Sequence, residues 1–186
     1  ALECGVDFFD HADIYGGGES EAVFGKLLKQ SPELREQMVL QSKCGIRPGR
    51  YDFSKEHILE SVDGSLKRLQ TDHLDVLLLH RPDALMEPDE VAEAFTALES
   101  SGKVRYFGVS NFNSRQLELL QSSLKQKILV NQLQLSIMHT GMIDHALRTN
   151  TDFCHAEDRD GEILDDCRLK GITIQAWSPF QYGFFE

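Results

Sequence analysis

Short apolar runs alternate with longer amphipathic segments along this chain. Six runs are rich in β-branched or large apolar residues and predict strands, at 6–12, 38–43, 74–80, 104–110, 128–135 and 172–178. The run from Val76 to Leu79 is apolar at consecutive positions, so we expect both faces of that strand to be covered. Strands of this kind, separated by helices, are typical of a parallel sheet.

The segments between the runs carry the spacing of amphipathic helices. One of them has its apolar residues at Ile58, Val62, Leu66 and Leu69, with Ser54 in front as the expected N-cap. Asp89 and Ser114 are expected to open two more helices in the same way. The glycine-rich stretch at 16–20 lacks the lysine of a phosphate-binding loop, so we interpret it as a turn into a helix around Phe24.

These elements favour an α/β barrel. Six strands in 186 residues give 31 residues per strand, the pitch of a (β/α)₈ TIM barrel. No G-x-G-x-x-G follows the first strand, as an open dinucleotide-binding sheet usually shows. We therefore expect one domain over 1–186, an incomplete barrel with about six of eight strand–helix units. The segment 1–6 reads as the tail of a helix, and with unpaired strand edges at both ends the chain alone should be poorly stable and inactive.

Four side chains of one chemical set fall where an apolar run ends and a loop begins. They are Asp10, Tyr15, Lys43 and His80. The ends of parallel strands point into active sites, so we expect these four to meet. Taken singly, Asp10, Lys43 and His80 are more often loop caps or surface ion pairs, and Tyr15 could be a half-buried aromatic, but the set together favours catalysis.

The set suits reduction of a carbonyl. A hydride that reaches a carbonyl carbon leaves negative charge on the oxygen, so a proton donor held there lowers the barrier. Tyr15 is the expected donor, and the Lys43 ammonium would stabilise its phenolate. Asp10 would compensate the charge of Lys43 in a water-poor pocket, and His80 would hydrogen-bond and orient the carbonyl.

The composition and charge of the chain restrict the kinds of molecule that it is expected to bind. With 19 basic and 30 acidic residues the net charge is −11, which disfavours nucleic acid and anionic lipid. No apolar stretch is long enough to span a membrane and no export signal is visible, so a cytoplasmic protein is expected. The four cysteines lack metal-type spacing and are interpreted as reduced thiols. A small carbonyl compound is thus the expected partner, with no metal.

Six segments in order resemble the aldo-keto reductases, in particular their bacterial and potassium-channel β-subunit-like branches. They are FFDHADIYG, QSKCG, LLLHRP, GKVRYFGVSNF, VNQLQ and AWSPF. The resemblance implies a (β/α)₈ barrel that reduces aldehydes and ketones with NADPH, or less often NADH. Basic residues after the eighth strand bind the 2′-phosphate in that family, and this chain ends before them, so NADPH is a family expectation.

The resemblance also assigns the cofactor side. Ser110, Asn111 and Gln132 offer hydroxyl and amide partners to the nicotinamide carboxamide. Trp177, the single tryptophan, could stack on the nicotinamide, although a barrel-rim aromatic is an equal interpretation. Ser178 could donate to the pyrophosphate or simply cap a turn before a proline.

Other interpretations stay open at this point. One is a regulatory protein that binds nicotinamide through the same barrel with little turnover, as resemblance to channel β-subunits permits. Another is a metal-dependent hydrolase built on His11 and Asp13, but a solvent-facing pair is favoured there because no motif completes a ligand set. The polar stretch 139–162 follows a strand and is expected to be a loop on the active-site face. It could shape substrate selection, or it could simply be a mobile surface loop.

Overall fold

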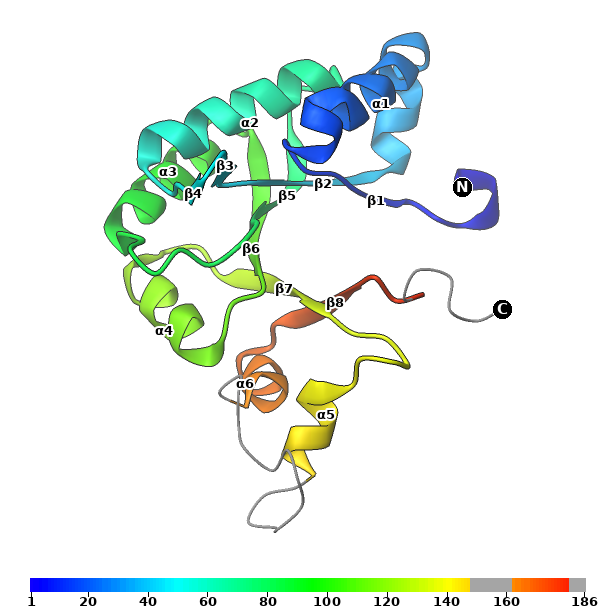
Figure 1. Cartoon of the computed structure of the whole chain (residues 1–186). Coiled ribbons are helices and arrows are strands. Elements are labelled where there is room, and N and C mark those ends of the chain that lie inside the picture. The colour runs from blue at the N-terminus through cyan, green and yellow to red at the C-terminus, as the bar shows by residue number, and fades with distance from the viewer. Residues whose placement is uncertain (148–161, 181–186) are drawn as a thin grey trace.

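A parallel sheet curled into a half-barrel forms the centre of the protein in a computed structural model that describes residues 1–147 and 162–180 (Figure 1). Its strands lie in the order β1-β2-β5-β6-β7-β8, and each pairs with its neighbour in parallel. Their bounds are Phe8–Asp10 (β1), Val39–Cys44 (β2), Leu74–Leu79 (β5), Val104–Ser110 (β6), Ile128–Gln134 (β7) and Thr173–Trp177 (β8). The predicted strands and the barrel class are therefore confirmed.

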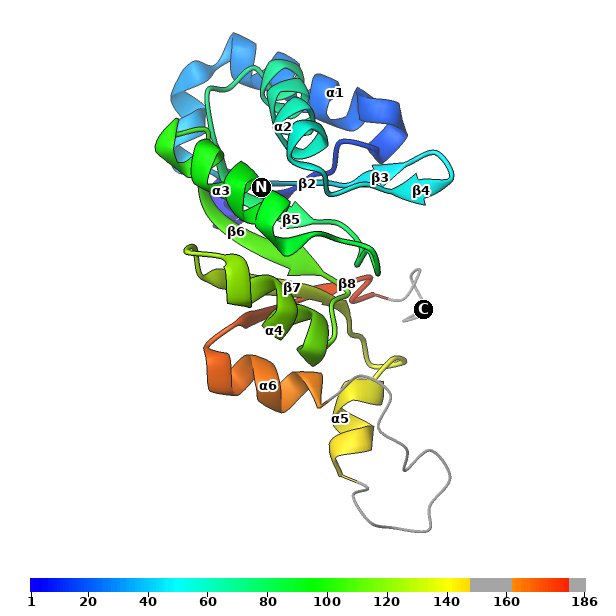
Figure 2. The same cartoon turned by 90° about the vertical axis from the view of Figure 1, so that its left-hand side faces the viewer.

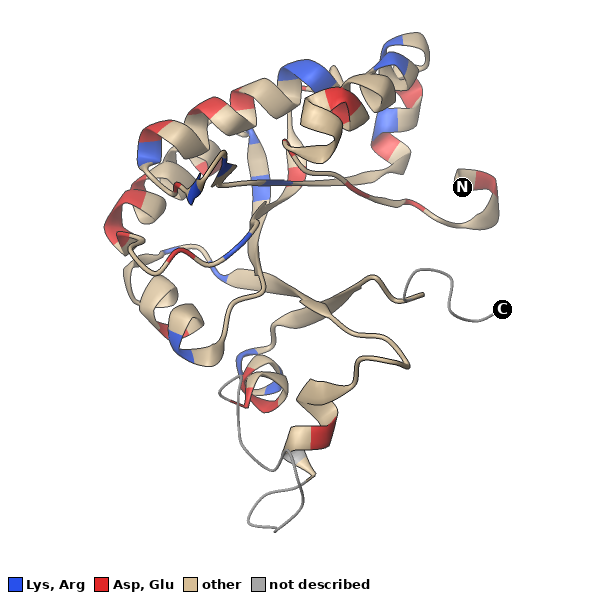
Figure 3. Ribbon diagram, in the orientation of Figure 1, with Lys and Arg blue, Asp and Glu red and all other residues tan. Residues whose placement is uncertain are grey.

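Helices cover the convex side of the sheet. The long ones are α1 (Glu19–Gln30), α2 (Lys55–Leu69), α3 (Pro88–Ser100), α4 (Ser114–Ser123) and α6 (Ile163–Lys170). Figure 2, turned by 90°, shows α3 and α4 in front of the strands, with α1 and α2 above them and α6 below. Acidic and basic residues lie mainly along these helices, on the outer surface (Figure 3).

The helix starts differ in part from the prediction. Ser54 is the N-cap of α2, and its hydroxyl accepts a hydrogen bond from the His57 N–H. The helix expected to open at Asp89 begins instead at Pro88, because proline fits the first helical turn, where its missing N–H has no partner to lose. The N-cap of α4 is Asn113, not the expected Ser114. Asn113 and Gln116, three residues later, form a capping box: the Asn113 side chain accepts from the Gln116 N–H, and the Gln116 side chain accepts from the Asn113 N–H.

Several short elements were not predicted or differ from the prediction. A hairpin of β3 (Ile46–Arg47) and β4 (Arg50–Tyr51) follows β2, and a 3₁₀ helix η3 (Pro32–Gln37) precedes it. Another 3₁₀ helix, η1 (Leu2–Cys4), lies in the segment expected to be a helix tail. The stretch expected as a loop at 139–162 contains α5 (Gly141–Ala146), and its residues 148–161 lie outside the described part.

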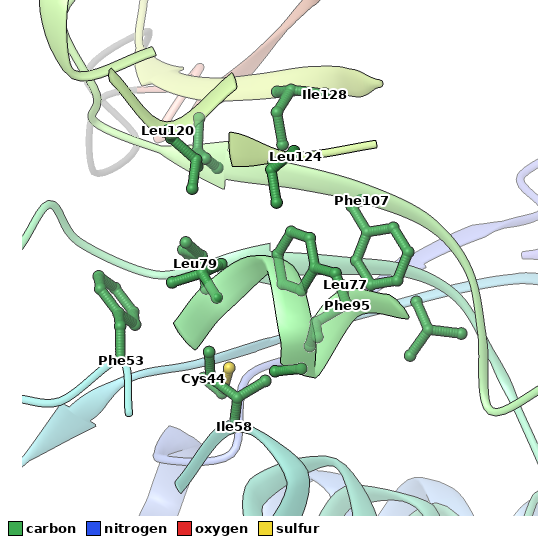
Figure 4. Packing of buried hydrophobic residues seen from close by; sticks show 14 of the residues in the cluster. Cys44, Phe53, Ile58, Leu77, Leu79, Phe95, Phe107, Leu120, Leu124 and Ile128 are labelled. Atoms are coloured by element: carbon green, nitrogen blue, oxygen red, sulfur yellow. The ribbon is translucent and has the colours of Figure 1, made fainter. Parts of the chain in front are cut away.

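The outer face of the sheet packs on the helices through large apolar side chains. Leu77 and Leu79 of β5 point into this layer, and Phe95 of α3 stacks on Phe107 of β6 with ring centroids 4.1 Å apart (Figure 4). All six residues of β5 are buried, as its continuous apolar pattern predicted. On the opposite, inner face, Val76 packs against Leu78 and Val130.

An ion-pair network around the buried Asp75 carboxylate fixes the first strands at their amino ends. The Asp75 carboxylate accepts hydrogen bonds from Arg35 at 2.8 Å, from Arg105 at 2.7 Å and from the Leu40 N–H at 2.9 Å. The network joins η3, β2, β5 and β6, so it keeps the strand register that the carboxyl ends of these strands depend on.

Within the described residues, each helix is too short or too polar to cross a bilayer. Of the cysteines described there, Cys44 and Cys167 are buried, Cys4 is exposed, and all three are free thiols.

Replacing Gly25 with alanine tests the close crossing of α1 over the end of α2. A Cβ at this position would lie 2.0 Å from the Arg68 carbonyl oxygen. Alanine favours a helix by about 1 kcal/mol over glycine, but overpacking costs about 1–3 kcal/mol, and backbone cannot move aside easily. We expect Gly25→Ala to lower the free energy of unfolding in urea titrations. Lys26→Ala, at an exposed position of the same helix, should stay within about 0.5 kcal/mol of wild type. A Gly25→Ala protein as stable as wild type would contradict the crossing.

Candidate active site

The four predicted catalytic side chains lie together at the carboxyl ends of the strands. The Lys43 ammonium donates to both oxygens of Asp10 at 2.7 Å, to the His11 carbonyl at 2.8 Å and to the Tyr15 hydroxyl at 3.2 Å. The Lys43 side chain is fully buried. Burial of an ammonium is tolerated when oxygen acceptors surround it, and here a carboxylate supplies the opposite charge.

Strand register and one short turn bring these groups together. Asp10 pairs with Gln41 at the end of β1, and Lys43 lies two residues further along β2, so both β2 side chains point to the inner face. The segment after β1 folds over this end, because the Asp13 N–H donates to the Lys43 carbonyl at 3.1 Å. This turn delivers Tyr15, the first residue of η2 (Tyr15–Gly18), above the ammonium.

His80 follows β5 and faces Tyr15, with ring centroids 5.8 Å apart at 79°. Burial, followed by the charges of Lys43 and Arg81, lowers the pKa of His80 from 6.5 to about 4, against a smaller opposing effect of Asp10. The imidazole is therefore neutral at neutral pH. Its Nδ1 is buried without a hydrogen-bond partner among the described residues. A neutral ring can orient a polar group without adding a second cation beside Lys43.

A pocket of about 480 Å³ opens above these residues. Its lining includes Asp10, Tyr15 and His80 from one side of the curled sheet, and residues of β6, β7 and β8 from the other. This volume is of the size that small ligands occupy. The pocket is therefore lined by three of the four predicted catalytic residues, with Lys43 buried behind them, and by all the predicted cofactor residues.

The predicted cofactor residues form a hydrogen-bonded chain along the second side of the pocket. The Trp177 indole N–H donates to Asn111 Oδ1 at 3.0 Å, the Asn111 amide donates to the Ser110 hydroxyl at 2.8 Å, and that hydroxyl donates to the Gln132 carbonyl at 3.0 Å. Asn111 has a left-handed backbone with φ of 63°, an uncommon conformation that often marks a functional position. Ser178, with φ of 50°, lines the same pocket.

Gln132 also reaches across to the catalytic side. Its amide nitrogen donates to Asp10 Oδ2 and to Gln175 Oε1, each at 3.2 Å. Its Oε1 accepts no hydrogen bond from the described residues and remains a free acceptor near the pocket.

The expected solvent-facing pair of His11 and Asp13 is wrong for His11, which is buried at 8% exposure. Its ring packs edge-on against Phe24 of α1, with centroids 4.7 Å apart. Behind it, Glu21 accepts from the Ser42 hydroxyl at 2.6 Å and from Arg68 at 2.7 Å. The sequence pattern missed this because α1, which covers the pair, is positioned by tertiary packing.

The Asp13 carboxyl shares this polar cluster. Burial, followed by the charge of Glu21, raises its pKa from 3.8 to about 6. Within residues 1–147 and 162–180, no group of three or more histidine, cysteine or acidic side chains is arranged to hold a metal ion.

Sequence reasoning missed three polar residues of this region. Gln41 and Gln175 contact Asp10 or its partners, and the Arg81 guanidinium lies 6.0 Å from the centre of the Trp177 ring. Gln41 and Gln175 carry a signal in retrospect, because each is a polar residue inside an otherwise apolar run. Arg81 directly follows His80, and no local pattern distinguishes it.

The fold and the pocket at the carboxyl ends of its strands are typical of barrel enzymes. Comparison with known proteins identifies the family. A family model described as "Aldo/keto reductase family" matches residues 1–186. The chain is 45% identical over 193 residues to "Uncharacterized oxidoreductase YcsN" of Bacillus subtilis, which covers 98% of this chain and 59% of that protein. It is 37% identical over 123 residues to "Putative voltage-gated potassium channel subunit beta" of Schizosaccharomyces pombe, covering 63% of this chain and 36% of that protein.

Solved structures agree. An aldo/keto reductase from Klebsiella pneumoniae, in complex with NADP and acetate, has a TM-score of 0.77 at 26% identity and covers 99% of this chain and 56% of its own. The protein belongs to the aldo/keto reductase family. The chain thus spans between about a third and three fifths of the length of these relatives.

The lowered pKa of His80 predicts an acid-labile contribution to stability. His80 has a pKa of about 4 in the folded state and about 6.5 in the unfolded chain. As pH falls below 6.5, the unfolded chain therefore binds a proton that the folded state does not, and the free energy of unfolding decreases until pH reaches about 4. The full effect is on the order of 3 kcal/mol. We expect the difference in free energy of unfolding between wild type and His80→Gln to shrink as pH falls from 6.5 to 4, in urea titrations across that range. A difference that stays constant with pH would show that His80 is not held neutral.

Proposed function

We propose that the full-length protein reduces aldehydes or ketones to alcohols with a nicotinamide cofactor, NADPH by preference. The observation that carries the proposal is the position of the Lys43 ammonium, 3.2 Å from the Tyr15 hydroxyl and 2.7 Å from both oxygens of Asp10. This arrangement provides a phenol whose conjugate base is stabilised by a fixed cation, at the wall of a ligand-sized pocket.

Each residue of the set has a distinct role in the proposed reaction. Tyr15 gives its proton to the carbonyl oxygen as negative charge develops there. Lys43 stabilises the phenolate that remains, and Asp10 holds Lys43 in place. The neutral His80 donates a hydrogen bond that orients the carbonyl oxygen toward Tyr15. A bound NADPH would supply the hydride.

The residues on the second side of the pocket fit a nicotinamide. A carboxamide needs both a donor and an acceptor, and Asn111, Ser110 and the free Oε1 of Gln132 supply them at neighbouring strand ends. The indole of Trp177, held by Asn111, offers a flat surface against which the ring can stack. We keep Ser178 as the proposed pyrophosphate donor, supported by its position on the pocket lining.

We also propose a cytoplasmic location and a small carbonyl compound as partner. The free thiols of Cys4, Cys44 and Cys167 support a reducing compartment. The net charge of −11 supports a preference against nucleic acid and anionic membrane surfaces.

Tyr15→Phe tests the reductase proposal. Removal of the hydroxyl removes the proton donor, so the rate of NADPH oxidation with a panel of aldehydes should fall by about 10²–10⁴-fold in the full-length protein. The matched control is Tyr106→Phe, the same change at a half-exposed position of β6, which should retain the wild-type rate. Equal rates in wild type and Tyr15→Phe would favour a nicotinamide-binding regulatory role over catalysis.

Cofactor binding has an optical readout, because Trp177 is the single tryptophan in this chain. Stacking of a nicotinamide on the indole should quench its fluorescence on titration with NADPH. Asn111→Ala removes the acceptor of the indole N–H and should weaken NADPH binding by about tenfold, since one hydrogen bond to each of two groups is lost. In a protein with tryptophans outside this chain, the Trp177→Phe variant provides the background. A fluorescence titration unaffected by Trp177→Phe would contradict stacking.

A further inference from the structure

Three glutamine amides, those of Gln41, Gln132 and Gln175, lie around Asp10 on the inner face of the sheet. The interior of a (β/α)₈ barrel is usually filled by branched apolar side chains, and Val76, Leu78 and Val130 follow that rule here. Gln41 on β2 and Gln175 on β8 depart from it, and Gln41 is fully buried. Burial of an amide is unfavourable unless its N–H and C=O groups find hydrogen-bond partners. These two side chains therefore require an arrangement that provides such partners.

The arrangement is a reciprocal amide pair. Gln41 Nε2 donates to Gln175 Oε1 at 2.9 Å, and Gln175 Nε2 donates back to Gln41 Oε1 at 3.2 Å. Gln41 Nε2 also donates to Asp10 Oδ1 at 2.7 Å. Gln175 therefore has no bond to Asp10 itself but is bonded to both glutamines that do, Gln41 and Gln132.

The carboxylate dictates the direction of the whole network. An ionised carboxylate is an acceptor without donors, so the amide nitrogen of Gln41 must face Asp10. Gln175 must then present its oxygen to that nitrogen, and it does. A flip of either amide would set nitrogen against nitrogen or oxygen against oxygen. The network thus has one consistent orientation, with Asp10 as its terminal acceptor.

The pair also joins the last strand of the curled sheet, β8, to the strand next to its other end, β2. β2 and β8 are separated by three strands in the sheet order, and the two glutamines are 134 residues apart in sequence. The contact therefore exists because the sheet curls, and it transmits the position of β8 to the carboxylate on β1. Asp10 itself contacts Lys43 through both oxygens, so the angle of its carboxylate plane fixes where the ammonium lies below Tyr15.

We propose that Gln41 and Gln175 are positioning residues for the Asp10–Lys43 ion pair. Gln41 holds the carboxylate plane directly, and Gln175 fixes the amide of Gln41. The inference rests on the proposed reductase function for its kinetic consequence, but the geometric consequence can be measured independently of any activity.

The test uses methionine, which is unbranched, similar in length to glutamine and without an amide. Gln41→Met removes the bond to Asp10, whereas Gln175→Met leaves that bond and frees the Gln41 amide to rotate. Gln30→Met, at an exposed position near the end of α1, is the matched control. All variants are made in the full-length protein, with kcat for an aldehyde, Kd for NADPH and a crystal structure of each.

We expect a graded loss of kcat. For Gln41→Met, kcat should fall by about 10- to 100-fold, which corresponds to the loss of one hydrogen bond to a charged group, and for Gln175→Met it should fall by less. The Kd for NADPH should stay within about twofold of wild type in both. In the crystal structure of Gln41→Met the Asp10 carboxylate should be rotated and Lys43 displaced from Tyr15. The control should match wild type in every measurement.

The outcomes separate the two proposals. A wild-type protein that oxidises no NADPH with any aldehyde defeats the proposed function, and the crystal structures then decide the inference alone. Variants that lose stability but retain kcat, with Asp10 and Lys43 unmoved, show a purely structural role for the amides and overturn the inference. If Gln41→Met does not fold, Gln175→Met provides the decisive structure and kcat.

Discussion

A fully buried lysine is the constraint on which this structure depends. An ammonium removed from water is strongly unfavourable unless oxygen acceptors replace its hydration, and Lys43 obtains them from Asp10, the His11 carbonyl and the Tyr15 hydroxyl. All three belong to the short segment that ends β1 and begins η2. The segment is therefore folded onto β2 by the same contacts that assemble the site. The geometry around Tyr15 is a consequence of burying Lys43.

Strand alternation lets one strand serve both the site and the core. In β2, Gln41 and Lys43 point to the inner face, while Ser42 and Cys44 point outward. Ser42 meets the buried Glu21 of α1, and Cys44 joins the apolar layer beneath the helices. Because a shift of register by one residue would exchange the two faces, the outer contacts fix the inner ones. The buried Asp75 network at the opposite end of the strands reinforces that register.

The sequence predicted what depends on local pattern and not what depends on packing between distant segments. The six strands and the strand-end position of Asp10, Lys43 and His80 follow from short apolar runs and the residue after each. The Gln41–Gln175 pair joins residues 134 apart, so no local pattern could reveal it. The burial of His11 escaped for a similar reason, since it depends on the angle at which α1 crosses β1. At Asn113 the error was one residue, because two adjacent polar residues can both cap a helix and the capping box decides between them.

The charge distribution explains why two hydrogen-bonding groups at one carbonyl have different duties in the proposed reaction. With its pKa lowered to about 4, His80 is neutral at pH 7, so it is a poor proton source there. Burial and the nearby cations of Lys43 and Arg81 produce this state, and a charged imidazole would also repel Lys43. In the proposed reaction the proton that the product gains would therefore come from Tyr15, whose hydroxyl lies 3.2 Å from the Lys43 ammonium. In the proposed reaction His80 orients the carbonyl oxygen, and the Lys43 ammonium, held by Asp10, stabilises the negative charge on Tyr15.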